Sequence, residues 1–185
     1  DVSRVWYLDD NRRLCAKVAD KVKAEMKLFS RTLEKHRTGE NIPPQSEPVM
    51  VELKGKLPGD GELLCIDLYD TDRHTVTICF DSSNKEMTVN YNRADRASRY
   101  GIRTVPCEMM EKETDIDILI DGNTFTLLWE HGLYRYTGKL YPQGNIGVDI
   151  KYRTKRHYDI TSLGEILIDF TGKKESERQT LSYTQ

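Results

Sequence analysis

Short segments of alternating apolar and polar residues follow one another from residue 49 to residue 172, and no helical pattern interrupts them. Gly, Asp, Asn and Pro residues stand in nearly every gap, as in the run Pro58-Gly59-Asp60-Gly61. Alternation gives a strand one apolar and one polar face, and closely spaced turns are typical of an antiparallel sandwich or barrel. The predicted strands are residues 49–57, 62–70, 74–81, 86–92, 115–122, 123–130, 132–138, 145–153 and 164–172.

The first 38 residues have a different pattern. Apolar residues recur there at steps of three or four, which keeps them on one face of an α-helix, and Lys and Arg residues occupy the other positions. The sequence therefore predicts one long amphipathic helix, which either packs on its own domain or pairs with a protein partner or a second copy of the chain. The apolar stripe consists of Leu14, Val18, Val22, Met26, Phe29 and Leu33.

A polar segment with Pro43, Pro44 and Pro48 separates the two patterns. Each Pro holds the residue before it in an extended conformation, which is typical of a linker. We therefore expect an N-terminal helix over residues 1–38, a Pro-rich linker over 39–48, an all-β sandwich over 49–172 and a polar tail over 173–185.

Charge and motifs exclude several classes of function. The formal net charge of -2 provides no field that attracts nucleic acid or an anionic membrane, so neither is expected as a partner. No apolar run approaches the roughly 20 residues that a membrane-spanning helix needs. The chain also lacks the common hydrolase, metalloprotease and phosphate-binding motifs, which indicates a non-enzymatic protein without a cofactor or metal.

Four cysteines, Cys15, Cys65, Cys79 and Cys107, are scattered without metal-ligand spacing. Buried free thiols are the simpler interpretation, and two disulfides are the alternative. The chain has no N-x-S/T sequon. Together these features favour a cytoplasmic location over a secreted or luminal one, without excluding the latter.

The predicted hairpin of residues 74–92 carries a row of polar side chains on one face of both strands. On the first strand, Cys79 and Asp81 belong to this row, and on the second strand Asn90 and Asn92 do. Such a face can present hydrogen-bonding groups to a sugar.

The order of segments in residues 48–172 resembles that of the galectin family. The strand that ends in Phe80 stands where galectins have an H-x-N-P-R run, Asn92 stands at their V-x-N segment, and Tyr100-Gly101 is similar to the W-G pair that follows. Residues 115–120 and 125–128 are similar to the F-x-I-x-I and F-x-V strands, and residues 160–164 to the I-x-x-L-x-I segment. The resemblance implies a galectin-like jelly roll with a sugar-binding face.

The sugar-binding positions implied by this resemblance are mostly replaced. Cys79 stands at the histidine and Asp81 at the asparagine of the first motif, while Asn92 matches the asparagine of the second. Tyr100 stands where galectins have the tryptophan on which galactose stacks, and Arg103 stands where they have a glutamate. Because a change from Glu to Arg turns an acceptor into a donor, β-galactoside binding of the usual kind is not expected.

The leading hypothesis is therefore a galectin-like module that binds a protein partner through the helix, through a tyrosine-rich hairpin with Tyr134 and Tyr136, or through both. One alternative is a lectin of altered specificity, and another is a non-catalytic module of a larger carbohydrate-active protein. The lectin would use Asn90, Asn92 and Tyr100 together with an arginine-rich loop that contains Arg99 and Arg103.

Overall fold

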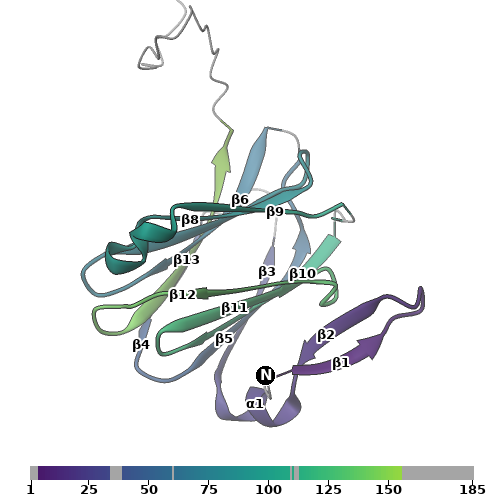
Figure 1. Cartoon of the computed structure of the whole chain (residues 1–185), viewed down its shortest axis with the longest axis horizontal. Coiled ribbons are helices and arrows are strands. Elements are labelled where there is room, and N and C mark those ends of the chain that lie inside the picture. The colour runs from purple at the N-terminus through teal and green to yellow at the C-terminus, as the bar shows by residue number, and fades with distance from the viewer. Residues whose placement is uncertain (1–3, 34–38, 60, 109, 111–112, 156–185) are drawn as a thin grey trace, which may run out of the picture. The chain divides into compact units, whose positions relative to one another are not determined.

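The computed structural model describes residues 4–33, 39–59, 61–108, 110 and 113–155, in which two packed β-sheets form a sandwich with an added hairpin (Figure 1). Residues 1–154 belong to one compact unit. The strands of this unit are β1 (Arg4–Leu8), β2 (Leu14–Val18), β3 (Lys27–Leu33), β4 (Glu40–Gln45), β5 (Val49–Lys56), β6 (Glu62–Tyr69), β7 (Thr75–Asp81), β8 (Glu86–Arg93), β9 (Ile102–Pro106), β10 (Glu113–Asp121), β11 (Thr124–Trp129), β12 (Tyr134–Lys139) and β13 (Ile146–Thr154). Its helices are α1 (Asp20–Glu25) and the 3-10 helix η1 (Asp95–Tyr100).

The strands are arranged in two layers. One sheet has five strands in the order β12-β11-β10-β5-β3, and the other has six in the order β4-β13-β6-β7-β8-β9. Strands β1 and β2 pair only with each other. All pairings are antiparallel except that of β3 with β5, which is parallel.

The core lies between the two sheets and is built by the apolar faces that the alternation predicts. On β7 the side chains of Val76, Ile78 and Phe80 are buried. Phe80 meets Trp129 of β11 edge to face, with the ring centroids 5.7 Å apart, so this contact joins the two layers. The all-β sandwich predicted from the sequence is confirmed, and the predicted strands between residues 49 and 153 correspond to β5–β8 and β10–β13. The predicted strand 164–172 and the tail 173–185 lie outside the described residues.

The predicted long N-terminal helix is wrong, because only the six residues of α1 are helical between Arg4 and Leu33. Steps of four are also multiples of two, so most of the same stripe fits one face of an extended strand. On β3, Phe29 and Leu33 face the main core, and the parallel ladder with β5 satisfies the backbone of this segment. Pairing and burial therefore outweigh helix propensity here.

The Pro-rich segment expected as a linker contains β4, which extends the six-stranded sheet by pairing with β13. Both Pro43 and Pro44 lie within this strand, and β4 is the edge of its sheet. Proline is tolerated at an edge strand and at a bulge, and both prolines lie where the pairing of β4 with β13 shifts register between Ile42 and Gln45. Consequently, residues before position 49 contribute strands to both sheets.

The cysteines divide into one pair and two free thiols. Cys65 of β6 and Cys79 of β7 lie directly opposite each other and form a disulfide, so the expectation of free thiols is wrong for these two. Cys15 and Cys107 are free and buried. No helix in the described part of the chain has the length and apolar character to cross a membrane.

Candidate ligand-binding groove

The segment from β2 to α1 packs on the outer face of the five-stranded sheet. Val22 and Met26 contact a small second core that includes Leu119 of β10 and Leu128 of β11. Lys23 forms an ion pair with Glu52 of β5, and the Ser30 hydroxyl donates to the same carboxylate at 2.9 Å. The hydrogen bond from Lys23 lowers the pKa of Glu52, which therefore stays ionised and holds α1 to the sheet.

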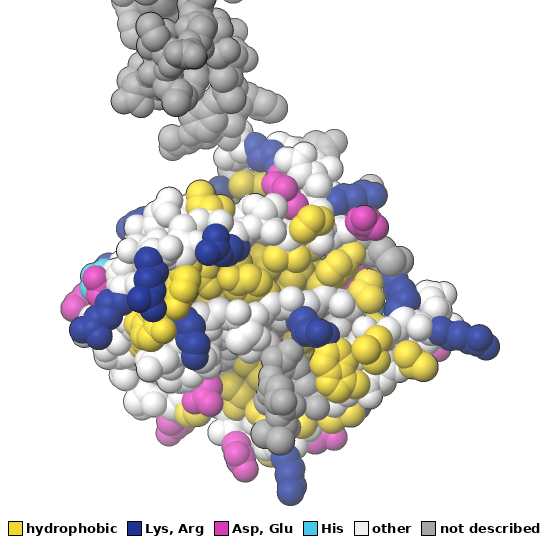
Figure 2. Space-filling model, viewed as in Figure 1, with side chains coloured by type: hydrophobic (Ala, Val, Ile, Leu, Met, Phe, Trp, Pro, Cys, Tyr) yellow, Lys and Arg dark blue, Asp and Glu magenta, His cyan; other side chains and the backbone are white. Residues whose placement is uncertain are grey.

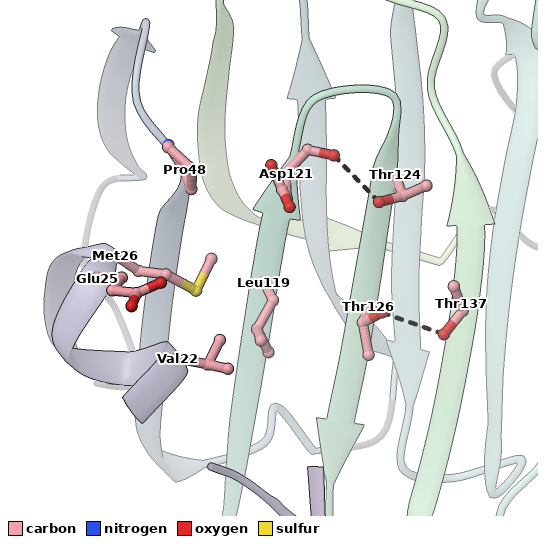
Figure 3. Close-up of a pocket in the computed structure, with 9 residues that line it drawn as sticks. All are labelled: Val22, Glu25, Met26, Pro48, Leu119, Asp121, Thr124, Thr126 and Thr137. Atoms are coloured by element: carbon pink, nitrogen blue, oxygen red, sulfur yellow. Dashed lines mark hydrogen bonds between the residues drawn. The ribbon is translucent and has the colours of Figure 1, made fainter. Parts of the chain in front are cut away.

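A groove of about 410 Å³ lies between this segment and strands β10, β11 and β12 (Figure 3). The α1 side presents Val22 and Met26 together with the carboxylate of Glu25, and the sheet side presents Leu119 beside hydroxyl and carboxylate side chains. Pro48 closes one end, next to a hydrogen bond of 2.9 Å from the Lys27 amide to the Pro48 carbonyl. The groove is lined by Val22, Glu25, Met26, Pro48, Leu119, Asp121, Thr124, Thr126 and Thr137.

The threonines of the groove are placed by strand alternation. Thr124 and Thr126 project from β11 on the face opposite Phe125, which is buried in the main core. The hydroxyls of Thr126 and Thr137 lie 3.1 Å apart across β11 and β12, as Figure 3 shows. Glu25 and Asp121 are exposed and add carboxylate acceptors. The groove thus offers threonine hydroxyls on the sheet side, aliphatic surface on and next to α1, and one carboxylate on each side.

Asp117 lies on the same outer face of β10, opposite Glu52 of β5 and Leu128 of β11. Burial raises the pKa of Asp117 to about 6, and the negative charges of Glu52 and Asp115 add to this effect. A carboxyl group in this position is therefore partly protonated in weakly acidic solution.

The predicted sugar-binding row lies on the outer face of the six-stranded sheet, away from this groove. Cys79 is bridged to Cys65, and Asp81 is buried, where it accepts hydrogen bonds from the amides of the following turn. The Asn90 side chain accepts a hydrogen bond from the Asn92 amide at 2.9 Å. These contacts already occupy several of the groups that the sequence offered as ligands.

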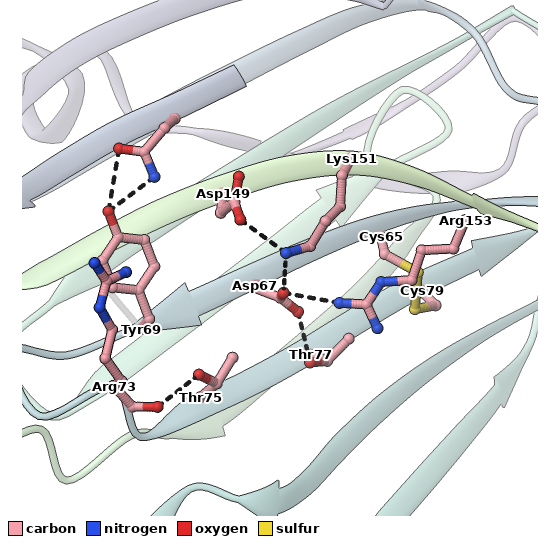
Figure 4. Close-up of polar contacts among 11 residues, drawn as sticks. Cys65, Asp67, Tyr69, Arg73, Thr75, Thr77, Cys79, Asp149, Lys151 and Arg153 are labelled. Atoms are coloured by element: carbon pink, nitrogen blue, oxygen red, sulfur yellow. Dashed lines mark hydrogen bonds and ion pairs between the residues drawn. A yellow bond between two sulfur atoms is a disulfide. The ribbon is translucent and has the colours of Figure 1, made fainter. Parts of the chain in front are cut away.

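A polar network crosses the same face (Figure 4). Lys151 and Arg153 of β13 converge on the buried Asp67 of β6, at 2.7 Å and 2.8 Å, and the Thr77 hydroxyl donates to it at 2.6 Å. Burial alone would raise the pKa of Asp67, but the hydrogen bonds from Lys151 and Thr77 and the positive charges lower it. The network satisfies a buried carboxylate and gives this face a structural role.

The structure separates Tyr100 from the asparagines with which the sequence grouped it. Tyr100 ends η1 and packs edge to face on Tyr91, whose side chain points into the core, whereas Asn92 is exposed on the opposite face of β8. The Tyr100 hydroxyl instead lies 3.5 Å from that of Tyr141, with Arg99 over the Tyr100 ring. Tyr134 stacks on Trp129 with the rings 5.5 Å apart and contacts the core.

The apolar stripe proposed for a partner is also divided. Leu14 is exposed, Val18 is buried in the second core, Phe29 and Leu33 contact the main core, and only Val22 and Met26 of the stripe line the groove. Sequence reasoning missed Thr124, Thr126 and Thr137 because outward threonines on strands are common on solvated faces. In the described residues, no three His, Cys, Asp or Glu side chains are grouped to hold a metal ion.

No protein-family model and no curated protein matches the sequence. Among solved structures, the GH32 beta-fructofuranosidase BmSUC1 of Bombyx mori is similar with a TM-score of 0.53 and 15% identity, covering 82% of this chain and 30% of that one. An exo-inulinase from Aspergillus awamori is similar with a TM-score of 0.56 and 10% identity, covering 82% of this chain and 34% of that one. The chain thus spans about a third of the length of these enzymes, and the likeness concerns the fold.

The resemblance to galectins is wrong. The similar structures are glycoside hydrolases of the fructofuranosidase type, and the sandwich shares its fold with a part of them. The galectin pattern was misleading because alternating strands and tight turns occur in every antiparallel sandwich, and they do not specify how the strands are ordered.

Proposed function

We propose that this domain is a non-catalytic carbohydrate-binding module that holds a short neutral oligosaccharide in the groove between α1 and β10–β12. The observation that carries the proposal is the combination of aliphatic surface with hydroxyl and carboxylate groups in one groove. A sugar ring is itself amphipathic, with C–H groups on its faces and hydroxyls around its rim, so it requires both kinds of surface at once.

The aliphatic surface on and next to α1 can receive the C–H face of the ring. Val22, Met26 and Leu119 present aliphatic and thioether surface there, and the flexible Met side chain can adapt to the shape of a ligand. The sheet side can bind the hydroxyls, since threonine both donates and accepts and Asp121 accepts, and Glu25 adds an acceptor from the α1 side. Ligand sites typically have volumes of about 300–1,000 Å³, and the groove lies within this range.

The class of ligand is supported by the fold. The sandwich is similar to part of a beta-fructofuranosidase and part of an exo-inulinase, both of which act on carbohydrates. Fructo-oligosaccharides are therefore the first ligands to test. Neutral gluco-oligosaccharides of equal length provide the comparison, because their rings and hydroxyl positions differ.

The test is isothermal titration calorimetry of the full chain with fructo-oligosaccharides, using wild type, Thr126→Val and Thr137→Val. Valine keeps the shape of threonine and removes its hydroxyl, so each variant should weaken binding by about two- to tenfold, the effect of one lost hydrogen bond. The matched control is Thr104→Val, which removes an exposed hydroxyl from β9 of the other sheet. The proposal fails if no neutral oligosaccharide binds, or if both groove variants bind as tightly as the control.

A further inference from the structure

Four tyrosines come together at the edge where β8, η1 and β12 meet, and we name this cluster the tyrosine edge: Tyr91, Tyr100, Tyr136 and Tyr141. The hydroxyls of Tyr91 and Tyr136 lie 3.0 Å apart, and those of Tyr100 and Tyr141 lie 3.5 Å apart. Tyr91 is buried, while the other three are half-buried and therefore reach solvent. The edge thus combines aromatic surface with a group of closely spaced hydroxyls.

One positive side chain contacts these hydroxyls, and the charge of two others reaches them. Arg99 lies over the ring of Tyr100 at 5.2 Å from its centroid, and it donates to the Tyr100 hydroxyl at 3.3 Å. The hydrogen bond from Tyr141 and the contact with Arg99 lower the pKa of Tyr100, and the charge of Lys139 acts in the same direction. Burial and the hydrogen bond with Tyr136 raise the pKa of Tyr91, and the charge of Arg103 opposes this rise. Arg99 therefore contacts the tyrosine hydroxyls directly, whereas Arg103 and Lys139 act on them through their charge alone.

These cations have no acidic partner in the described part of the chain. The ion pairs of the sandwich involve other side chains, and none of them includes Arg99, Arg103 or Lys139. Figure 2 shows Lys and Arg side chains on both sides of a band of hydrophobic side chains, Tyr included, between the layer of β8 and β9 and the layer of β11 and β12. Clustered like charges without a counter-charge favour the binding of an anion.

From this arrangement we infer that the tyrosine edge is a second binding site, which takes the carboxylate or sulfate group of an acidic saccharide. A guanidinium binds a planar or tetrahedral oxyanion with two donors, and tyrosine hydroxyls add donors at its side. The exposed parts of the tyrosine rings provide the apolar surface that a sugar ring covers. The proposed groove contains carboxylates and no cation, so it disfavours the same ligand.

The two sites use opposite faces of β12. Tyr136 points to the tyrosine edge, and its neighbour Thr137 lines the groove, since successive side chains of a strand point to opposite sides. The inference extends the proposed carbohydrate-binding function, but the two can be tested separately because they depend on different side chains.

The test measures binding of the full chain to an oligogalacturonate by calorimetry at low salt, with a neutral oligosaccharide, a sulfated oligosaccharide and inorganic sulfate as comparison ligands. Arg99→Gln and Arg103→Gln should each weaken binding of the acidic saccharides about tenfold. Tyr141→Phe keeps the ring and removes the hydroxyl, and it should weaken binding about threefold. Lys17→Gln changes the net charge equally at an exposed position on β2, and it should leave the affinity unchanged.

Binding should also weaken as salt is added, because the contact is between charges at an exposed site. Thr126→Val should leave the acidic saccharide bound, so a failure of the groove and a failure of the tyrosine edge give different results. The inference is overturned if the arginine variants bind the acidic saccharides within twofold of wild type. It is also overturned if inorganic sulfate binds as tightly as the saccharides, or if Lys17→Gln weakens binding as much as Arg99→Gln.

Discussion

Replacing Asp117 by Asn should stabilise the protein at neutral pH. Asp117 is half-buried on the outer face of β10, where burial, assisted by the charges of Glu52 and Asp115, raises its pKa from an ordinary 3.8 to about 6. Between these two values the folded state binds more protons than the unfolded state. The contribution of Asp117 to stability is therefore fully present below about pH 4 and is lost as the pH rises through 6.

The magnitude follows from the shift. A change of one pKa unit corresponds to about 1.4 kcal/mol, so a shift of about two units makes the folded protein up to about 3 kcal/mol less stable above pH 6 than a neutral side chain would. Asn has nearly the same shape and cannot ionise. Asp117→Asn should accordingly raise the free energy of unfolding at pH 7 by about 1–3 kcal/mol and have little effect at pH 4.

Urea unfolding followed by circular dichroism at half-unit steps from pH 4 to pH 8 measures this difference. Asp121→Asn is the matched control, because Asp121 is exposed on the same strand. The reasoning is refuted if the difference between Asp117→Asn and wild type is constant across this range, or if the control shows the same pH dependence.

Two further predictions concern the backbone and the disulfide. Gly132→Ala should destabilise the fold by more than 1 kcal/mol and release the N-terminal hairpin, because φ is +77° there and a Cβ would stand 1.7 Å from the Ala16 carbonyl oxygen. Gly122→Ala is the control, because Gly122 also has a positive φ, +53°, but has open space around it, so this variant measures the cost of the backbone conformation alone. Equal unfolding midpoints for the two variants would contradict the steric explanation. Cys79→Ala removes the bridge to Cys65. The bridge closes a loop with a sequence separation of 14, and the entropy that it removes from the unfolded chain corresponds to about 3 kcal/mol of stability. The variant should unfold equally with and without reductant. If reductant has no effect on the wild type, this role of the bridge is disproved.

Most of the strands after residue 49 could be predicted because their alternation matches the faces that the sandwich buries. The edge strand β9 was missed, and its residue Arg103 was expected in a loop, because the largely exposed residues of β9 show no such alternation. The first 33 residues could not be predicted, because Phe29 and Leu33 fit a helical stripe and a strand face equally well. The choice between them depends on the parallel pairing of β3 with β5, which is a long-range contact that no local pattern reveals. The disulfide was missed for the same reason, since only the register of β6 and β7 brings Cys65 opposite Cys79.

The candidate sites could be predicted only in part. Arg99 and Tyr100 were recognised as a pair, but Tyr136 joins the cluster through Tyr91, because the two sheets pack face to face. Val22 and Met26 were singled out for partner binding, and their place in the groove follows from the short helix that lays them on β10. The sequence identified side chains able to bind a ligand, whereas the topology determines which of them face the same space.

The central claim, that the groove binds a neutral oligosaccharide, is tested most directly by NMR titration of the ¹⁵N-labelled full chain with a fructo-oligosaccharide. We predict saturable shifts of the amide signals of Val22, Glu25, Met26, Thr126 and Thr137, while those of Asn90 and Asn92 on the outer face of the six-stranded sheet stay unchanged. Saturable shifts confined to the six-stranded sheet, or no shifts at millimolar ligand, would contradict the account.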